Sequence, residues 1–124
     1  MSMSLREVAV PWVKAVFVLA LLGVFVLSLL PSDHLPHIAT SIWDKAQHAL
    51  AFTLLAVLAL LAWPGRPVWR TAGALLLYGI AIEWAQAATG WRHGDTQDVL
   101  ADAVGVAIGC VLVAAIRRLR ARSG

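Results

Sequence analysis

Charged residues are scarce in this 124-residue chain: they make up 14% of the sequence, while hydrophobic residues make up 60%. About a quarter of the residues in a typical soluble domain are charged, so this chain has too little polar side chain to cover a water-exposed surface. The composition therefore indicates a membrane protein. The length predicts a single domain that covers residues 1–124.

Signatures of soluble enzymes are also missing. The one cysteine, Cys110, excludes an internal disulfide and a metal site built on several thiolates, and we interpret it as a small buried apolar residue. The zinc-protease motif HExxH is absent, and no serine or cysteine nucleophile stands at motif spacing from a base. The net charge of +3 comes from basic residues that flank apolar runs, which indicates anionic lipid headgroups and not nucleic acid as the partner.

Long apolar runs are present, and turns that contain proline or glycine separate them. They predict an all-α fold, a four-helix transmembrane bundle in up-down-up-down order. The expected spans are about residues 10–30, 44–63, 69–89 and 98–116. Because Pro31 and Pro36 disfavour helix, we interpret residues 31–43 as a loop, with Asp44 in the first turn of the second helix.

An even number of spans places both termini on one side of the membrane, and the basic residues predict which side. That side carries eight basic residues and Glu7, a net charge of +7, whereas the other side carries −4. The eight are Arg6, Lys14, Arg66, Arg70, Arg117, Arg118, Arg120 and Arg122. The positive-inside rule then predicts that both termini are cytoplasmic.

This topology gathers polar residues at the outer face. They are Asp44, Lys45, His48, Glu83, Gln86, Arg92, Asp98 and Asp102. Ionisable groups near a span are energetically expensive, so these residues are candidates for a functional site. Asp98 and Asp102 share one helix face with Gly105 and Gly109, whose GxxxG spacing lets another helix backbone approach closely. We expect this face to point into the bundle.

The polar residues follow a family pattern. DKAQHALAF, EWAQ, WR and DVLADAVGVAIG together resemble the VanZ-like membrane proteins, a family named for a protein associated with resistance to the glycopeptide teicoplanin. The resemblance covers about residues 43–109, and it departs from the family at Asp102, where an asparagine is usual. It implies a multi-pass protein of the bacterial cytoplasmic membrane with a role in cell-envelope properties or glycopeptide resistance.

Several of these residues also have a purely structural interpretation. Asp44 and Lys45 fit a helix cap and a lysine that extends to the interface, and His48 fits either a packed histidine or a ligand. Glu83 must be paired or protonated, with Lys45, His48 or Arg92 as partners. His48, Glu83 and Asp98 are the candidate metal ligands. We interpret His34, His37 and His93 as loop residues in water.

Three functional classes fit the sequence. The first is a protein whose outer-face pocket binds a lipid headgroup or the polar part of an amphiphile, which the resemblance extends to a glycopeptide-like amphiphile. The second is an intramembrane enzyme that acts on an envelope lipid precursor through a metal or its carboxylates. The third is a structural or assembly protein with a polar lock between helix ends. The sequence leaves the cofactor and the oligomeric state open, including a dimer.

Overall fold

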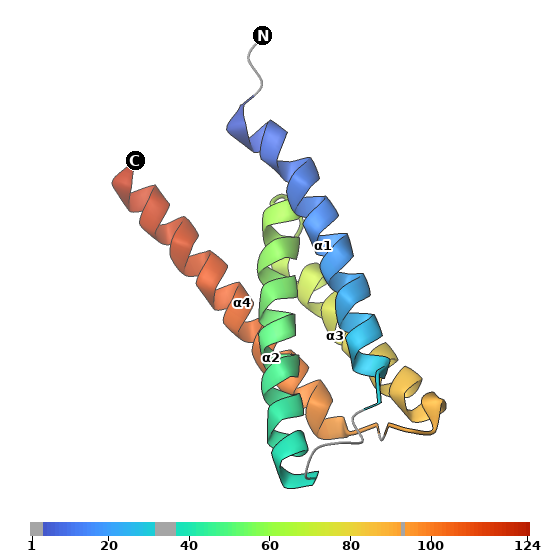
Figure 1. Cartoon of the computed structure of the whole chain (residues 1–124). Coiled ribbons are helices and arrows are strands. Elements are labelled where there is room, and N and C mark those ends of the chain that lie inside the picture. Colours follow the sequence, from blue (N-terminus) through green and yellow to red (C-terminus); the bar gives the residue numbers. More distant parts are fainter. Residues whose placement is uncertain (1–3, 32–36, 93) are drawn as a thin grey trace.

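The computed structural model describes residues 4–31, 37–92 and 94–124, and for residues 37–41 it gives only the course of the backbone. In these ranges the chain forms four helices: α1 (Leu5–Leu29), α2 (His37–Ala62), α3 (Val68–Thr89) and α4 (Thr96–Ser123). Successive helices run in opposite directions, so the two ends of the chain lie at the same end of the bundle (Figure 1). The prediction of an all-α four-helix bundle is confirmed.

The helix starts differ from those expected. Ser4 caps α1 through a capping box, in which the Ser4 hydroxyl accepts from the Glu7 N–H and the Glu7 carboxylate accepts from the Ser4 N–H. Because α2 starts at His37, the prediction of a loop through residue 43 was wrong. Asp44 was predicted in the first turn of this helix but lies beyond it. His34 and His93, which were predicted to lie in loops, are outside the described residues. The same prediction for His37 was wrong, because His37 is the first residue of α2, and its side chain is not described.

The core forms where α2 packs against α3 and α4. Its fully buried side chains include Phe52 and Leu55 of α2 and Ile82 of α3, and the most extensive helix contact is between α2 and α4. By contrast, α1 has no buried residue and lies against α2 and α3 from outside (Figure 1). The bundle is thus a three-helix core with α1 at its edge.

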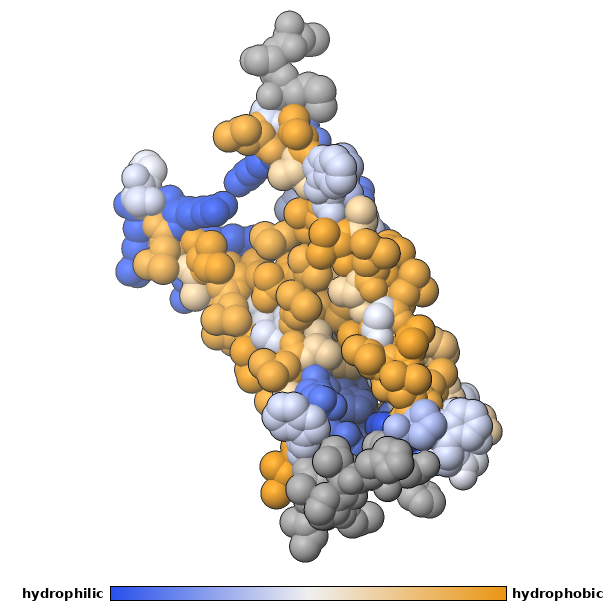
Figure 2. Space-filling model, viewed as in Figure 1, coloured by the Kyte–Doolittle hydropathy of each residue, from blue (hydrophilic) through white to orange (hydrophobic). Residues whose placement is uncertain are grey.

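The face of the molecule seen in Figure 2 is mainly apolar between two ends that carry hydrophilic residues. By length and composition, α1, the part of α2 from Ile42 to Ala62, and α4 are each able to cross a membrane. The third helix is 22 residues long, enough for about 33 Å at ~1.5 Å per residue, but it is less apolar because it carries polar side chains. Those of Thr71, Glu83 and Gln86 are buried inside the bundle, away from the apolar exterior.

Tryptophans lie near both ends of the bundle. Trp12 and Trp69 are mostly exposed near the end that holds the termini, while Trp43, Trp84 and Trp91 are mostly exposed near the other end. Amphipathic rings in two exposed belts are typical of the two interfaces of a bilayer. The apolar band between them is what lipid chains would surround.

Candidate functional site

A group of charged side chains lies at the end of the bundle where α2 begins, α3 ends and α4 begins. We call it the polar cluster: Lys45, His48, Glu83, Asp95, Asp98 and Asp102. A hydrophilic area is visible at this end between apolar flanks (Figure 2). Four of the six residues are buried, namely His48, Glu83, Asp98 and Asp102. Burial of this many ionisable groups is costly unless they are paired or bind something.

His48 is held between two aspartates of α4. Its Nδ1 lies 2.7 Å from Asp102 Oδ1, and its Nε2 lies 3.9 Å from Asp98 Oδ2. Asp98 and Asp102 are four residues apart and therefore project from the same face of α4 toward α2. Because a carboxylate accepts, Nδ1 is the protonated nitrogen and Nε2 keeps a free lone pair when the ring is neutral.

Lys45 joins α2 to the start of α4. Its Nζ lies 3.2 Å from Asp95 Oδ2 and 3.7 Å from Asp98 Oδ1. Asp95 also caps α4, because its Oδ1 accepts from the Gln97 N–H at 2.9 Å. That hydrogen bond and the contact with Lys45 hold the pKa of Asp95 below its usual value.

Asp95 is the site residue that sequence reasoning missed. The predicted span starts at residue 98, whereas α4 begins at Thr96 with Asp95 as its N-cap and Asp98 in its first turn. A signal was available: an N-cap aspartate stands just before a helix, and a second acidic residue three positions later fits the first turn. The sequence Asp-Thr-Gln-Asp at residues 95–98 has this pattern.

Glu83 is tied to the cluster through the backbone. Its Oε2 accepts a hydrogen bond from the Asp95 N–H, which fixes the end of α3 against the start of α4. Its Oε1 is buried and has no hydrogen-bond partner among the described residues. Within the described residues, neither Lys45 nor Arg92 forms an ion pair with Glu83.

Glycines make the close approach of these helices possible. A Cβ on Gly79 of α3 would lie 2.5 Å from Asp102 Oδ2, so α3 gives Asp102 its space by having no side chain there. A Cβ on Gly105 would overlap the Ala49 carbonyl oxygen, and one on Gly109 would lie 2.6 Å from the Ala56 Cβ. Gly105 and Gly109 thus lie directly against α2, below the two aspartates of α4.

Side chains near the end of α3 donate hydrogen bonds to the end of α1, and two of them belong to predicted site residues. Gln86 Nε2 donates to the Ser28 carbonyl at 2.8 Å, and Arg92 Nη1 donates to the Leu30 carbonyl at 3.0 Å. Trp91 Nε1 donates to the Leu29 carbonyl at 2.9 Å. The last carbonyls of a helix have no partner within it, so these three side chains complete the end of α1.

Asp44 belongs to this second group. Its Oδ2 lies 3.8 Å from Arg92 Nη2, and it makes no ion pair with Lys45 or His48 in the described part of the chain. The eight predicted residues therefore separate into a group around His48, where only Lys45 is partly exposed, and a second group of Asp44, Gln86 and Arg92, where only Gln86 is buried. The two groups lie at the same end of the bundle but use different partners.

Most of the unpartnered buried oxygen atoms belong to the group around His48. Within the described residues, four buried side-chain atoms lack a hydrogen bond: Glu83 Oε1, Gln86 Oε1, Asp98 Oδ1 and Asp102 Oδ2. All four are acceptors when the carboxyl groups are ionised. An unsatisfied buried acceptor costs about 1–3 kcal/mol, so the group favours an occupant that brings hydrogen-bond donors or positive charge.

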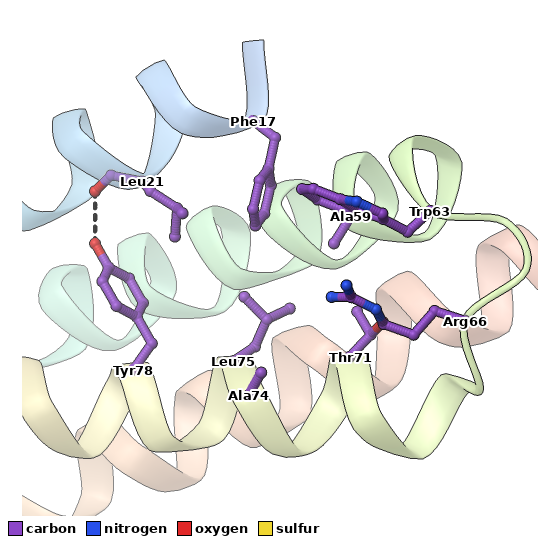
Figure 3. A pocket seen from close by; sticks show the side chains of 9 residues that line it. All are labelled: Phe17, Leu21, Ala59, Trp63, Arg66, Thr71, Ala74, Leu75 and Tyr78. Atoms are coloured by element: carbon purple, nitrogen blue, oxygen red, sulfur yellow. Dashed lines mark hydrogen bonds between the residues drawn. The ribbon is translucent and has the colours of Figure 1, made fainter. Parts of the chain in front are cut away.

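A separate cavity of about 220 Å³ lies toward the opposite end, between α1, α2 and α3 (Figure 3). Its lining is mainly apolar, with Phe17, Leu75 and Trp63 among the side chains that face it. The Tyr78 hydroxyl donates to the Leu21 carbonyl at its edge, and Arg66 extends toward it from the turn after α2 (Figure 3). None of the predicted site residues lines this cavity.

Comparison with known proteins identifies the family. The family model described as VanZ/LLP1 matches residues 16–117, which include all four helices in large part and every residue of the polar cluster. No curated protein and no solved structure matches the chain. The chain is therefore a membrane protein of the VanZ/LLP1 family.

Proposed function

We propose that this protein binds the headgroup of an envelope amphiphile at its polar cluster, from the outer face of the bacterial cytoplasmic membrane. The observation that supports this most directly is the set of unpartnered buried acceptors at one end of an otherwise apolar bundle. A headgroup with hydroxyl or amine groups brings the donors that these oxygens lack. Its lipid part would lie along the apolar exterior.

The charges of the site favour such a headgroup over a purely anionic one. Lys45 already contacts Asp95 and Asp98, and Arg92 already contacts Asp44 and the Leu30 carbonyl. The cations that an anionic headgroup would need are therefore engaged within the protein.

The orientation of the protein is part of the proposal. In the proposal α3 crosses the membrane together with α1, α2 and α4, which makes four crossings and places both termini on one side. That side is the cytoplasm, and the polar cluster lies at the outer face. The charge difference between the two ends supports this through the positive-inside rule. The hydrogen bond from Arg117 Nη2 to the Leu60 carbonyl also anchors one of the basic residues at the end that holds the termini.

The test compares the wild type with Glu83→Gln in mild detergent. Amphiphiles that co-purify are extracted and identified by mass spectrometry, and their amount per protein is measured. Loss of a hydrogen bond to a charged group costs about 1.5–3 kcal/mol, so retention should fall roughly 10- to 150-fold. The melting temperature should stay equal or rise, because the change removes a buried charge while it keeps most of the shape.

The matched control is Asp44→Asn, which removes a carboxylate at the same end but outside the polar cluster. It should keep the amphiphile. Cells that carry each variant are also tested for teicoplanin susceptibility, and Glu83→Gln should have the phenotype of a deletion. A Glu83→Gln protein that is stable, keeps its amphiphile and is fully active would refute a binding site, and an unstable one would indicate a structural lock.

A further inference from the structure

Three buried side chains from three helices converge within the polar cluster. His48 of α2, Glu83 of α3 and Asp98 of α4 each offer one ligand atom, and these atoms all lie within 4.8 Å of one another. All three side chains are buried. We infer that this group binds a divalent transition-metal ion of the Zn²⁺ or Mn²⁺ type, an inference that rests on the proposal that the polar cluster is a binding site.

The free atoms of these residues support the inference. Glu83 Oε1 and Asp98 Oδ1 have no hydrogen-bond partner among the described residues, and both side chains are more than nine-tenths buried. His48 Nε2 faces Asp98, with no hydrogen bond of its own among the described residues. One imidazole nitrogen and two carboxylate oxygens form a donor set that suits Zn²⁺ and Mn²⁺, and a set of three leaves coordination positions open.

Two of the three ligands, His48 and Glu83, are also held by a neighbour through their other atom. Asp102 Oδ1 accepts from His48 Nδ1 and so turns Nε2 toward the site. The Asp95 N–H holds Glu83 Oε2, and Lys45 Nζ lies near Asp98 Oδ1 on the outer side. A carboxylate on the far nitrogen of a histidine is the usual arrangement behind a metal-bound imidazole. This gives Asp102 a positioning role at the place where the family pattern has asparagine.

The charge balance favours such an occupant. The polar cluster contains four carboxylates and one lysine, and the buried part contains three carboxylates and one histidine. A divalent cation offsets two of these charges and uses the acceptors that have no partner. Metal–ligand distances of about 2.0–2.2 Å would draw the three ligand atoms closer together than they lie here. An open position on the ion can then take a hydroxyl oxygen of the bound headgroup.

The test titrates metal alone into protein purified in detergent without an affinity tag and stripped with chelator. Zn²⁺ and Mn²⁺ binding is measured by calorimetry, and Co²⁺ serves as a spectroscopic probe of a site with a nitrogen ligand. We expect one ion per chain, and a loss of affinity of at least about 100-fold in Glu83→Gln and His48→Gln. Asp102→Asn should weaken binding by about tenfold, because it keeps an acceptor for Nδ1 but loses the charge.

Asp44→Asn is again the control, and its metal affinity should equal that of the wild type. No stoichiometric binding, or binding that Glu83→Gln and Asp98→Asn leave unchanged, would overturn the inference. Amphiphile retention is measured in parallel with and without chelator. If the amphiphile stays after the metal is removed and no metal site is detected, the metal inference fails and the proposed function stands. If metal binds but no amphiphile is retained, the metal inference stands and the proposed function fails.

Discussion

Replacing Gly105 by alanine tests how closely α2 and α4 must approach. The added Cβ would overlap the Ala49 carbonyl oxygen and lie 3.0 Å from the Phe52 Cβ. Because the overlapped atom belongs to the backbone, a side-chain rotation cannot relieve the contact, and the helices must separate. Separation also weakens the 3.1 Å hydrogen bond from Thr53 Oγ1 to the Gly105 carbonyl.

The expected cost follows from these contacts. Overpacking costs about 1–3 kcal/mol, and a weakened hydrogen bond adds roughly 0.5–1.5 kcal/mol. The matched control is Gly73→Ala in α3, where an added Cβ meets nothing within 4 Å. Alanine is the better helix former by about 0.5–1 kcal/mol, so Gly73→Ala should be neutral or stabilising. Gly105→Ala gains the same propensity, so the two variants should differ by about 1.5–4.5 kcal/mol in unfolding free energy.

The assay is reversible unfolding of the detergent-solubilised protein by SDS, followed by tryptophan fluorescence. Both substitutions add the same methyl group to a helical glycine, so propensity and composition cancel in the comparison. If Gly105→Ala is as stable as Gly73→Ala, α4 does not pack against α2 through this glycine. The placement of Asp98 and Asp102 beside His48 would then lose its structural basis.

Two further predictions concern the ends of the bundle. In a Cys110→Ser background, Thr96→Cys should react with an impermeant thiol reagent on intact cells, and Ser123→Cys should react only after permeabilisation; the reverse pattern would place the termini outside. The lowered pKa of Asp95 predicts a pH effect, because the unfolded state, with a pKa near 3.9, binds more protons than the folded state does. The stabilisation by Asp95 is then present above about pH 4 and is lost as the pH falls through the lower folded pKa. The difference in melting temperature between wild type and Asp95→Asn should shrink on acidification, and a difference that is constant with pH would contradict this origin.

The sequence by itself determined the fold class and the end of the bundle at which the polar residues meet. Apolar runs of span length must be helical in a membrane, because only a helix satisfies all its backbone hydrogen bonds within one segment. Short turns then force neighbouring helices to alternate in direction. That alternation is enough to bring Asp44, Glu83 and Asp98 to the same end, whatever the details of packing.

Only the tertiary structure decided which of these residues contact one another. The periodicity of a helix shows which residues share a face, but not how far each helix is rotated or shifted against the next. Those quantities follow from packing, and they turn Gln86 and Arg92 toward the end of α1 and place Lys45 beside Asp95. They also set Gly79 against Asp102, which gives a buried carboxylate room beside His48. The sequence carried each of these residues, but their partners lie on other helices, at distances that only close packing fixes.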